Sequence, residues 1–155
     1  MENYFNVSEI QVQFLPDFKP SERPSISKSS DAYKIFIAHW DAGLMQFLEE
    51  FKVLLLNNAN RILGIVDISV GSKDAVMVDM RVIFSIALKA SACKIILAHN
   101  HPSGKLEPSN ADKAITTKAK EAGKVLDIEV CDHLIITPGG YYSFADNGEL
   151  EKNIL

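Results

Sequence analysis

The chain alternates between short apolar runs and segments in which apolar residues recur at helical spacing. Short apolar runs bounded by turn residues are typical of strands, and they predict strands at 51–56, 61–69, 94–98, 125–136 and 141–144. Helical spacing, together with capping residues, predicts helices at 30–40, 43–50, 79–90 and 109–122, the last one ending at Gly123. Strands interleaved with helices indicate an α/β or α+β layered domain with a mixed sheet.

The N-terminal part has a different pattern. Residues 9–15, which read EIQVQFL, alternate polar and apolar side chains and predict a short half-buried strand, with an edge position as one option. Residues 16–29 hold three prolines and four serines, which is typical of a connecting loop. We therefore expect a strand and loop over 1–29 and a folded domain over 30–155, which begins near Ser30, a good helix N-cap.

Composition narrows the functional classes. A chain of 155 residues with 47% hydrophobic residues fits one packed domain, and the net charge of −4 makes a nucleic-acid partner unlikely. Cys93 and Cys131 lie in apolar runs and are expected to be buried free thiols of a reducing compartment. Residues 1–5 do not resemble a signal peptide, and no apolar segment is long enough to span a membrane. We expect a cytoplasmic protein without membrane contact; its oligomeric state stays open.

Two histidines and a carboxylate carry the candidate chemistry. His99 and His101 end the apolar run 95–98, and side chains two residues apart on a strand point to the same side. Asp112 follows one loop later, just inside the helix expected from Ser109. Two imidazole nitrogens and one carboxylate oxygen leave the fourth position of a tetrahedral zinc site for water, as in catalytic zinc sites. The spacing therefore predicts a Zn²⁺ site.

The same residues also have a purely structural interpretation. Ser109 and Asp112 have the spacing of a capping box, with Ser109 as the N-cap. A single histidine at a strand end is more often hydrogen-bonded or exposed than bound to metal. Two imidazoles on one face repel when charged, which favours the metal, and the two interpretations are compatible because a helix cap can hold Asp112 toward an ion.

The spacing matches a known signature. His-x-His, seven residues, Ser, two residues and Asp is the signature of the JAMM (MPN+) metalloproteases. The matching residues are His99, His101, Ser109 and Asp112. With the segments 132–135 and 143–145 added, the sequence resembles the RadC family of bacterial JAMM-domain proteins from about residue 30 to 150. The resemblance implies a cytidine-deaminase-like α/β/α layered domain, the JAB/MPN fold. It also implies a short form, without the N-terminal helix-hairpin-helix region that RadC-like proteins often carry.

The resemblance implies roles as well. The two histidines and Asp112 would bind zinc, and Ser109 would lie near the oxyanion. In RadC-like sequences the general-base glutamate lies two residues before the aromatic that opens the first strand. Phe51 opens that strand here, so Glu49 is favoured, with Glu50 as the competitor. The implied activity is zinc-dependent hydrolysis of a peptide or isopeptide bond by a metal-activated water, on a protein or peptide substrate.

Two further segments bear on this interpretation. RadC-like sequences typically begin the central helix with His-Pro-Arg-Glu, whereas residues 79–82 read Asp-Met-Arg-Val and keep only Arg81. Asp132 and His133 are candidates for hydrogen bonds that support the metal ligands. The alternative for this pair is a polar step in a strand near the surface.

Other functions stay open. A non-catalytic metal-binding or scaffold MPN module is the main alternative to an enzyme. A metal-dependent nuclease linked to DNA repair is a weaker one, because HNH nuclease residues are dispersed along a ββα unit and do not form a contiguous His-Asn-His. A zinc deaminase requires His-x-Glu and Pro-Cys-x-x-Cys, and neither cysteine here has that spacing.

Overall fold

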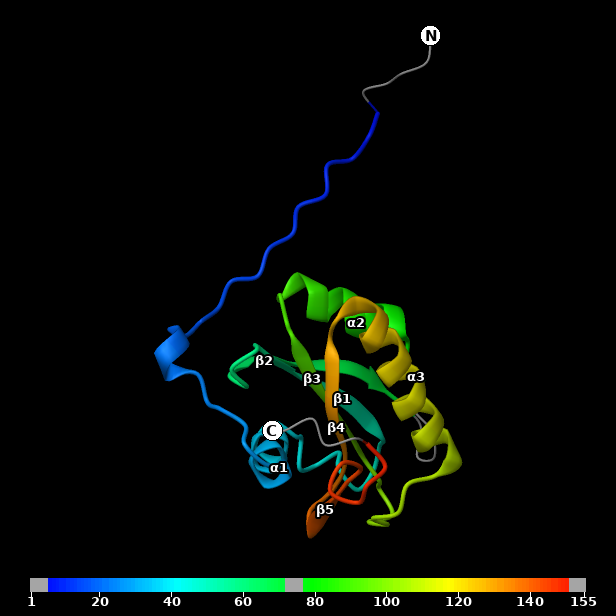
Figure 1. Ribbon diagram of the computed structural model, residues 1–155. Coiled ribbons are helices and arrows are strands. Elements are labelled where there is room, and N and C mark those ends of the chain that lie inside the picture. Colours follow the sequence, from blue (N-terminus) through cyan, green and yellow to red (C-terminus); the bar gives the residue numbers. More distant parts are fainter. Residues whose placement is uncertain (1–5, 72–76, 151–155) are drawn as a thin grey trace.

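The computed structural model describes residues 6–71 and 77–150 (Figure 1). The expectations for residues 1–5 and for the end of the domain at 151–155 lie outside the described residues. The helices are the 3-10 helix η1 (Pro20–Glu22), α1 (Ser29–Ala38), α2 (Met80–Lys89) and α3 (Asn110–Leu126). The strands are β1 (Glu50–Leu56), β2 (Ile62–Val70), β3 (Lys94–Asn100), β4 (Glu129–Thr137) and β5 (Gly140–Ser143).

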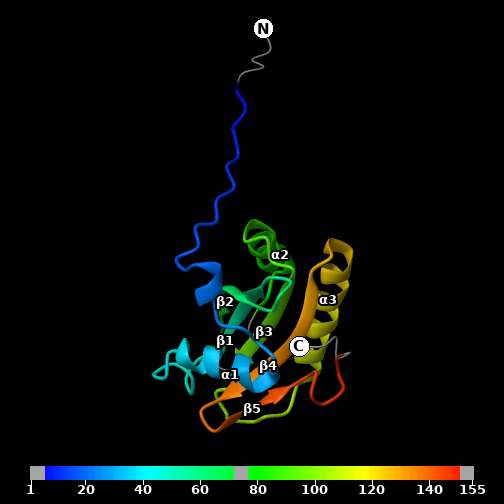
Figure 2. The same cartoon turned by 60° about the vertical axis from the view of Figure 1, so that its left-hand side comes forward.

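The strands form one mixed sheet in the order β2-β1-β3-β4-β5. β1 is antiparallel to both β2 and β3, β3 and β4 are parallel, and β5 returns antiparallel to β4. α1 covers one face of this sheet, while α2 and α3 cover the other (Figures 1 and 2). The expected α/β/α layered domain with a mixed sheet is confirmed.

Each face of the sheet has its own apolar core, which explains why the strands read as continuous apolar runs. In β1, Phe51, Val53 and Leu55 pack against α2 and α3, whereas Leu54 and Leu56 pack toward α1. No helix in residues 6–71 and 77–150 is both long and apolar enough to cross a membrane.

β4 contains an irregularity that decides which of its residues face α3. Ile95 pairs with Val130 and Ile96 pairs with Asp132, so Cys131 is an extra residue in the register. One extra residue reverses the alternation of side chains between the two faces. Val130 therefore packs in the α2/α3 core, and His133, three residues later, faces the same helices.

The short helix expected at 43–50 is wrong. Residues 42–47 form turns instead, and the chain is extended from Glu50. The amide of buried Asn100 binds the backbone carbonyl oxygens of Met45 and Leu48, at 2.6 and 2.8 Å. A side chain remote in sequence thus fixes these carbonyl groups in a non-helical segment.

The boundary expected near Gly123 is also wrong. α3 continues to Leu126 and ends at Asp127, which has the left-handed conformation (φ 55°). Gly123 lies inside the helix. Glycine is needed there because a side chain would collide with the carbonyl oxygen of Ile128. The strand that was expected from residue 125 therefore begins only at Glu129.

Two smaller expectations differ as well. Ser30 lies inside α1, whose start is capped by the carboxylate of Asp31, which accepts the N–H groups of Ser27 and Lys28. Cys93 is exposed, whereas Cys131 is buried; both are free, and burial raises the pKa of the Cys131 thiol to about 12.

The strand expected at 9–15 is not formed. Residues 6–16 are extended without strand pairing to any other described residue, and they lead away from the domain (Figures 1 and 2). Their apolar side chains are exposed: Ile10 is 87% and Val12 71% accessible. The alternating pattern is present, but no residue in 6–71 or 77–150 pairs with this segment as a neighbouring strand.

Candidate metal centre

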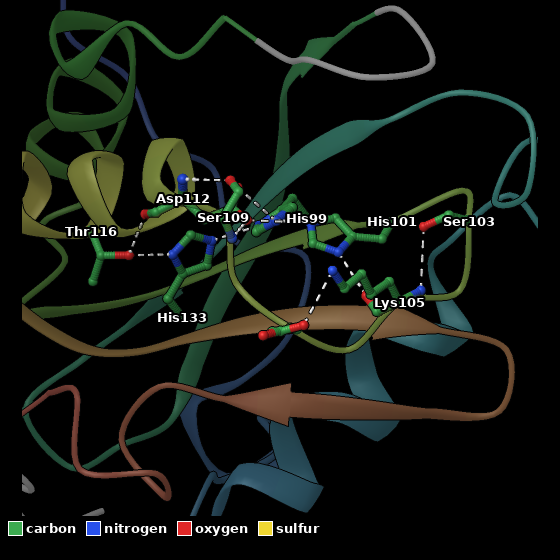
Figure 3. A network of polar contacts seen from close by, with 9 residues as sticks. His99, His101, Ser103, Lys105, Ser109, Asp112, Thr116 and His133 are labelled. Carbon is green, nitrogen blue, oxygen red and sulfur yellow. Dashed lines mark hydrogen bonds and ion pairs between the residues drawn. The ribbon is translucent and has the colours of Figure 1, made fainter.

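The two histidines converge at the C-terminal end of β3 (Figure 3). Their Nε2 atoms lie 3.0 Å apart. The carboxylate of Asp112 faces both, with Oδ1 at 3.2 Å from His99 Nε2 and Oδ2 at 3.3 Å from His101 Nε2. Three residues from two elements thus present ligand atoms to one point.

Glu49 joins this group from the segment that leads into β1. One ligand atom from each of Glu49, His99, His101 and Asp112 lies within 4.8 Å of the other three. The reason is the sheet register, since Phe51 of β1 pairs with His99 of β3.

The neighbouring Glu50 lies elsewhere. Its carboxylate is 3.8 Å from the ammonium group of buried Lys52, which lies over the ring of Trp40. These residues belong to the α1 side of the sheet. The structure therefore brings Glu49 to the histidines and Glu50 to the opposite face.

Asn100, between the two histidines, holds the segment that carries Glu49. It is fully buried, and its Oδ1 accepts the backbone N–H of Glu50 at 2.7 Å, while its amide donates to Met45 and Leu48. This role of Asn100 was not predicted from the sequence. The sequence pattern could have indicated it: a polar residue between two histidines on a strand points to the opposite face of the sheet, where its side chain needs hydrogen-bond partners.

Asp112 is fixed by the start of α3, where the expected capping box is confirmed. Ser109 Oγ accepts the N–H of Asp112 at 3.1 Å, and Asp112 Oδ2 accepts the N–H of Ser109 at 2.7 Å. Burial acts to raise the pKa of Asp112, but the adjacent His101 and His99 rings outweigh it and hold the pKa far below its usual range. The group is therefore a carboxylate.

The pKa values of the two histidines shift in opposite directions. Burial, the largest influence, lowers the pKa of His99, so this ring is neutral near pH 7. Burial also acts on His101, but its hydrogen bonds with Asp112 and with the Lys105 carbonyl raise its pKa on balance. A neutral imidazole and an ionised carboxylate are the forms that bind metal.

A buried chain of hydrogen bonds fixes the tautomer of His99 (Figure 3). The backbone carbonyl of Asp112 only accepts, so the Thr116 hydroxyl, 2.9 Å away, donates to it. Thr116 Oγ1 then accepts from His133 Nδ1 at 2.6 Å, and His133 Nε2 accepts from His99 Nδ1 at 2.7 Å. The Nε2 atom of His99 is left with a lone pair.

His101 is constrained in the same way. Its Nδ1 lies 2.7 Å from the carbonyl oxygen of Lys105 and must donate to it, so in the neutral form of the ring its Nε2 also presents a lone pair. A proton on His101 Nε2 can serve as donor across the 3.0 Å between the two Nε2 atoms; when His101 is neutral, both atoms present lone pairs and a bound cation can take the place of that proton. Two imidazoles with one carboxylate, and a second carboxylate at hand, are a donor set that fits zinc and similar divalent metals.

Asp132 and His133 form hydrogen bonds with different partners. His133 belongs to the chain of hydrogen bonds just described. The carboxylate of Asp132 accepts instead from the Ser143 hydroxyl and from the backbone N–H groups of His133 and Ala145, at 2.6 to 3.0 Å. Asp132 thus ties β4 to the end of β5. Both residues are buried, which excludes the surface position considered for them.

A pocket of about 730 Å³ gives access to the group. It is lined by Glu49, His101, Ser109 and Asp112 and by the loop 102–108 that joins β3 to α3. Lys105 and Glu107 form an exposed ion pair on that loop, at 3.2 Å. Three of the four metal-ligand candidates, Glu49, His101 and Asp112, therefore line an open cleft, and His99 is buried.

The α/β/α fold with this group at the end of β3 defines a JAB-type domain with a candidate metal centre. The sequence profile of the RadC-like JAB domain matches residues 26–149, and the chain belongs to this family. It is 51% identical over 100 residues to a UPF0758 protein of Flavobacterium johnsoniae, a match that covers 64% of this chain and 44% of that protein. It is 40% identical over 131 residues to a UPF0758 protein of Rubrobacter xylanophilus, a match that covers 83% of this chain and 55% of that protein.

The chain spans about half the length of the curated relatives it matches. Their names state no activity, so they fix the family and leave the chemistry to be argued from the site. The chain departs from the typical RadC-like sequence at the start of α2. There the Asp79 carboxylate accepts the N–H of Arg81 at 2.8 Å and caps the helix.

Proposed function

We propose that the protein is a zinc-dependent metallohydrolase of the JAMM type that cleaves a peptide or isopeptide bond. His99, His101 and Asp112 would hold the Zn²⁺ ion. The observation that carries the proposal is the pair of Nε2 atoms 3.0 Å apart, which face the carboxylate of Asp112 beside an open pocket that His101 and Asp112 line. A zinc ion held by these residues would lower the pKa of a water molecule and polarise a substrate carbonyl group.

Glu49 is the general base in this proposal. It takes a proton from the attacking water and later gives it to the leaving amine. Its position in the pocket wall, with a carboxylate oxygen within 4.8 Å of the other ligand atoms, supports this role. Its neighbour Glu50, bound to Lys52 on the other face, has no access to the pocket side of the sheet.

Ser109 is the proposed oxyanion donor. Its Oγ lone pair is used by the Asp112 N–H at the helix cap, which leaves the hydroxyl hydrogen for a second partner. Ser109 also lines the pocket, where a substrate carbonyl oxygen would lie. A donor held in place before the reaction stabilises the developing negative charge without rearrangement.

His133 is proposed to orient His99, with Asp132 acting one step further out through the backbone N–H of His133. The hydrogen bonds from Thr116 through His133 support this role, because they select the His99 tautomer with an unprotonated Nε2. Such outer hydrogen bonds fix the ring and raise the basicity of a metal ligand. The substrate we propose is a protein or peptide, and the two free cysteines support a reducing, cytoplasmic location.

Metal content is the first test. Elemental mass spectrometry after dialysis should give about one zinc ion per chain for the wild type. His101→Ala should lose it. His39→Ala removes an exposed histidine at the end of α1 and should keep it. A wild type that holds no stoichiometric metal even after reconstitution would overturn the proposal.

Hydrolysis is the second test. Zinc-loaded wild type should cleave members of a peptide library, and Asp112→Ala should not. Tight zinc binding with no cleavage of any peptide or isopeptide would instead indicate a scaffold module. Cleavage of DNA that is lost in Asp112→Ala would indicate a nuclease.

A further inference from the structure

The outer edge of β2 is incompletely covered. β2 is the terminal strand of the sheet, and most of its residues are only partly buried, whereas β1 is buried throughout. Leu63, Val66 and Ile68 form part of the rim of the α2/α3 core. A long apolar edge strand is a template for pairing with another strand.

The same chain contains a segment with the pattern of the missing strand. We call residues 6–18 the arm. Within it, Ile10, Val12 and Phe14 alternate with polar residues, and no described residue pairs with them as a strand. Ile10 and Val12 are more than two-thirds exposed (87% and 71%), and Phe14 is 38% exposed. A row of exposed apolar side chains on one side of an extended segment marks an interaction surface.

At one end of this edge, the N-terminal part of the same chain already pairs with the backbone next to β2. Ser25 forms an antiparallel bridge with Arg61, the residue just before β2. Ile62 donates its N–H to the Pro24 carbonyl, and Ile26 donates to the Asn60 carbonyl, both at 2.9 Å. The outward-facing backbone at the start of β2 thus accepts a strand from the N-terminal part of a chain.

We propose that residues 9–15 of one chain add to the β2 edge of a second copy, and that two copies exchange their arms reciprocally. We expect Ile10, Val12 and Phe14 to lie on the α2/α3 face beside Leu63, Val66 and Ile68, with the polar residues of the arm on the other face. Two identical exchanges related by a two-fold axis form a closed dimer, which is the commonest symmetry of soluble oligomers.

The segment 16–23 explains why the partner is a second copy. Pro16, Pro20 and Pro24 have no N–H to give to a ladder, and η1 turns the chain immediately before Ser25. The arm beyond η1 leads away from its own sheet (Figures 1 and 2). Residues 16–23 span up to roughly 26 Å when extended, enough to reach a neighbouring molecule.

The oligomeric state tests the proposal. Light scattering on the full-length wild type should give a dimer, and the double variant Ile10→Lys/Val12→Lys should be a monomer at the same concentration. Gln11→Lys/Gln13→Lys adds the same charge on the polar face of the arm and should remain a dimer. A wild type that is monomeric at the highest concentration tested, or a dimer that the first variant leaves intact, would overturn it.

Crosslinking identifies the partner. In a Cys93→Ser background, which removes the exposed native thiol, Val12→Cys/Val66→Cys is treated with a bifunctional maleimide. A covalent dimer on a denaturing gel, absent for Val12→Cys alone, supports exchange. A link within one chain would mean that the arm folds onto its own sheet, and no link at all would mean that it does not reach β2; either result contradicts the proposal.

Discussion

The candidate metal centre and the arm differ in how many of their groups have partners within the chain. At the centre, buried His99, Asn100 and His133 have hydrogen-bond partners within the same chain, and Asp112 is fixed by a helix cap. In the arm, exposed apolar side chains have no strand beside them among the described residues. The hydrogen bonds of the centre are therefore made within a single chain, whereas the proposed pairing of the arm requires a second molecule. Changes at the centre should act equally at every protein concentration, and changes in the arm should not.

Glu49→Gln should have the largest effect. The amide keeps the size of the side chain but takes no proton, so peptide hydrolysis should fall by about 10²–10⁴-fold. The metal content should stay at the wild-type value, because the two histidines and Asp112 are unchanged. The rate with a cleavable peptide and elemental analysis of the same sample check both parts. A variant that lost its metal would assign Glu49 to the ligands rather than to proton transfer.

Asn100→Ala should remove the hydrogen bonds that attach the segment bearing Glu49 to β3. It leaves the N–H of Glu50 and the carbonyl groups of Met45 and Leu48 without their partner, which should lower the free energy of unfolding by on the order of 3 kcal/mol. Hydrolysis should fall too, because the segment that carries Glu49 loses its attachment. Denaturant unfolding measures the first effect, with exposed Asn58→Ala as the control that should unfold like the wild type.

His133→Phe should weaken metal binding without emptying the core. The new ring keeps the stacking that His133 makes with Phe144, at 4.8 Å between centroids, but has no nitrogen for His99. Affinity for zinc should fall about 10–100-fold, the usual cost of removing an outer hydrogen bond from a ligand. Competition with a chelator measures it, and the absorption spectrum of the Co²⁺ form should shift. Thr116→Val should act in the same direction and less strongly. Unchanged affinity in both variants would leave the tautomer argument without support.

The arm should give the smallest effect and the only one that depends on concentration. If dimers form by arm exchange, a tenfold rise in protein concentration should raise the Tm of the wild type by roughly 2–4 °C at most. Ile10→Lys/Val12→Lys should have a Tm that does not change with concentration, and its zinc affinity should equal that of the wild type. A loss of zinc in this variant would show that the two regions are not independent.

The features that the sequence predicts well depend on local geometry. His99 and His101 are two residues apart on a strand, and Ser109 and Asp112 have the spacing of a cap, so neither relation needs knowledge of the tertiary fold. Glu49 came from the family resemblance, since proximity to a histidine 50 residues away depends on the pairing of β1 with β3.

The features that the sequence did not predict depend on contacts between distant segments. The hydrogen bonds of Asn100 override the expected helix at 43–50. The extra residue Cys131 in β4 turns His133 toward α3, and no propensity marks it in advance. The strand predicted at 9–15 has the right pattern, but a strand forms only beside another one.

The hydrogen bonds of Asn100 also have a mechanical consequence. His99 and His101 are attached to β3 by the backbone, and the segment bearing Glu49 is attached to the same strand through the residue between them. The two proposed histidine ligands and the segment of the proposed base are therefore attached to one strand through three consecutive residues. A shift of the helices that cover the sheet need not change the separation between these histidines and Glu49.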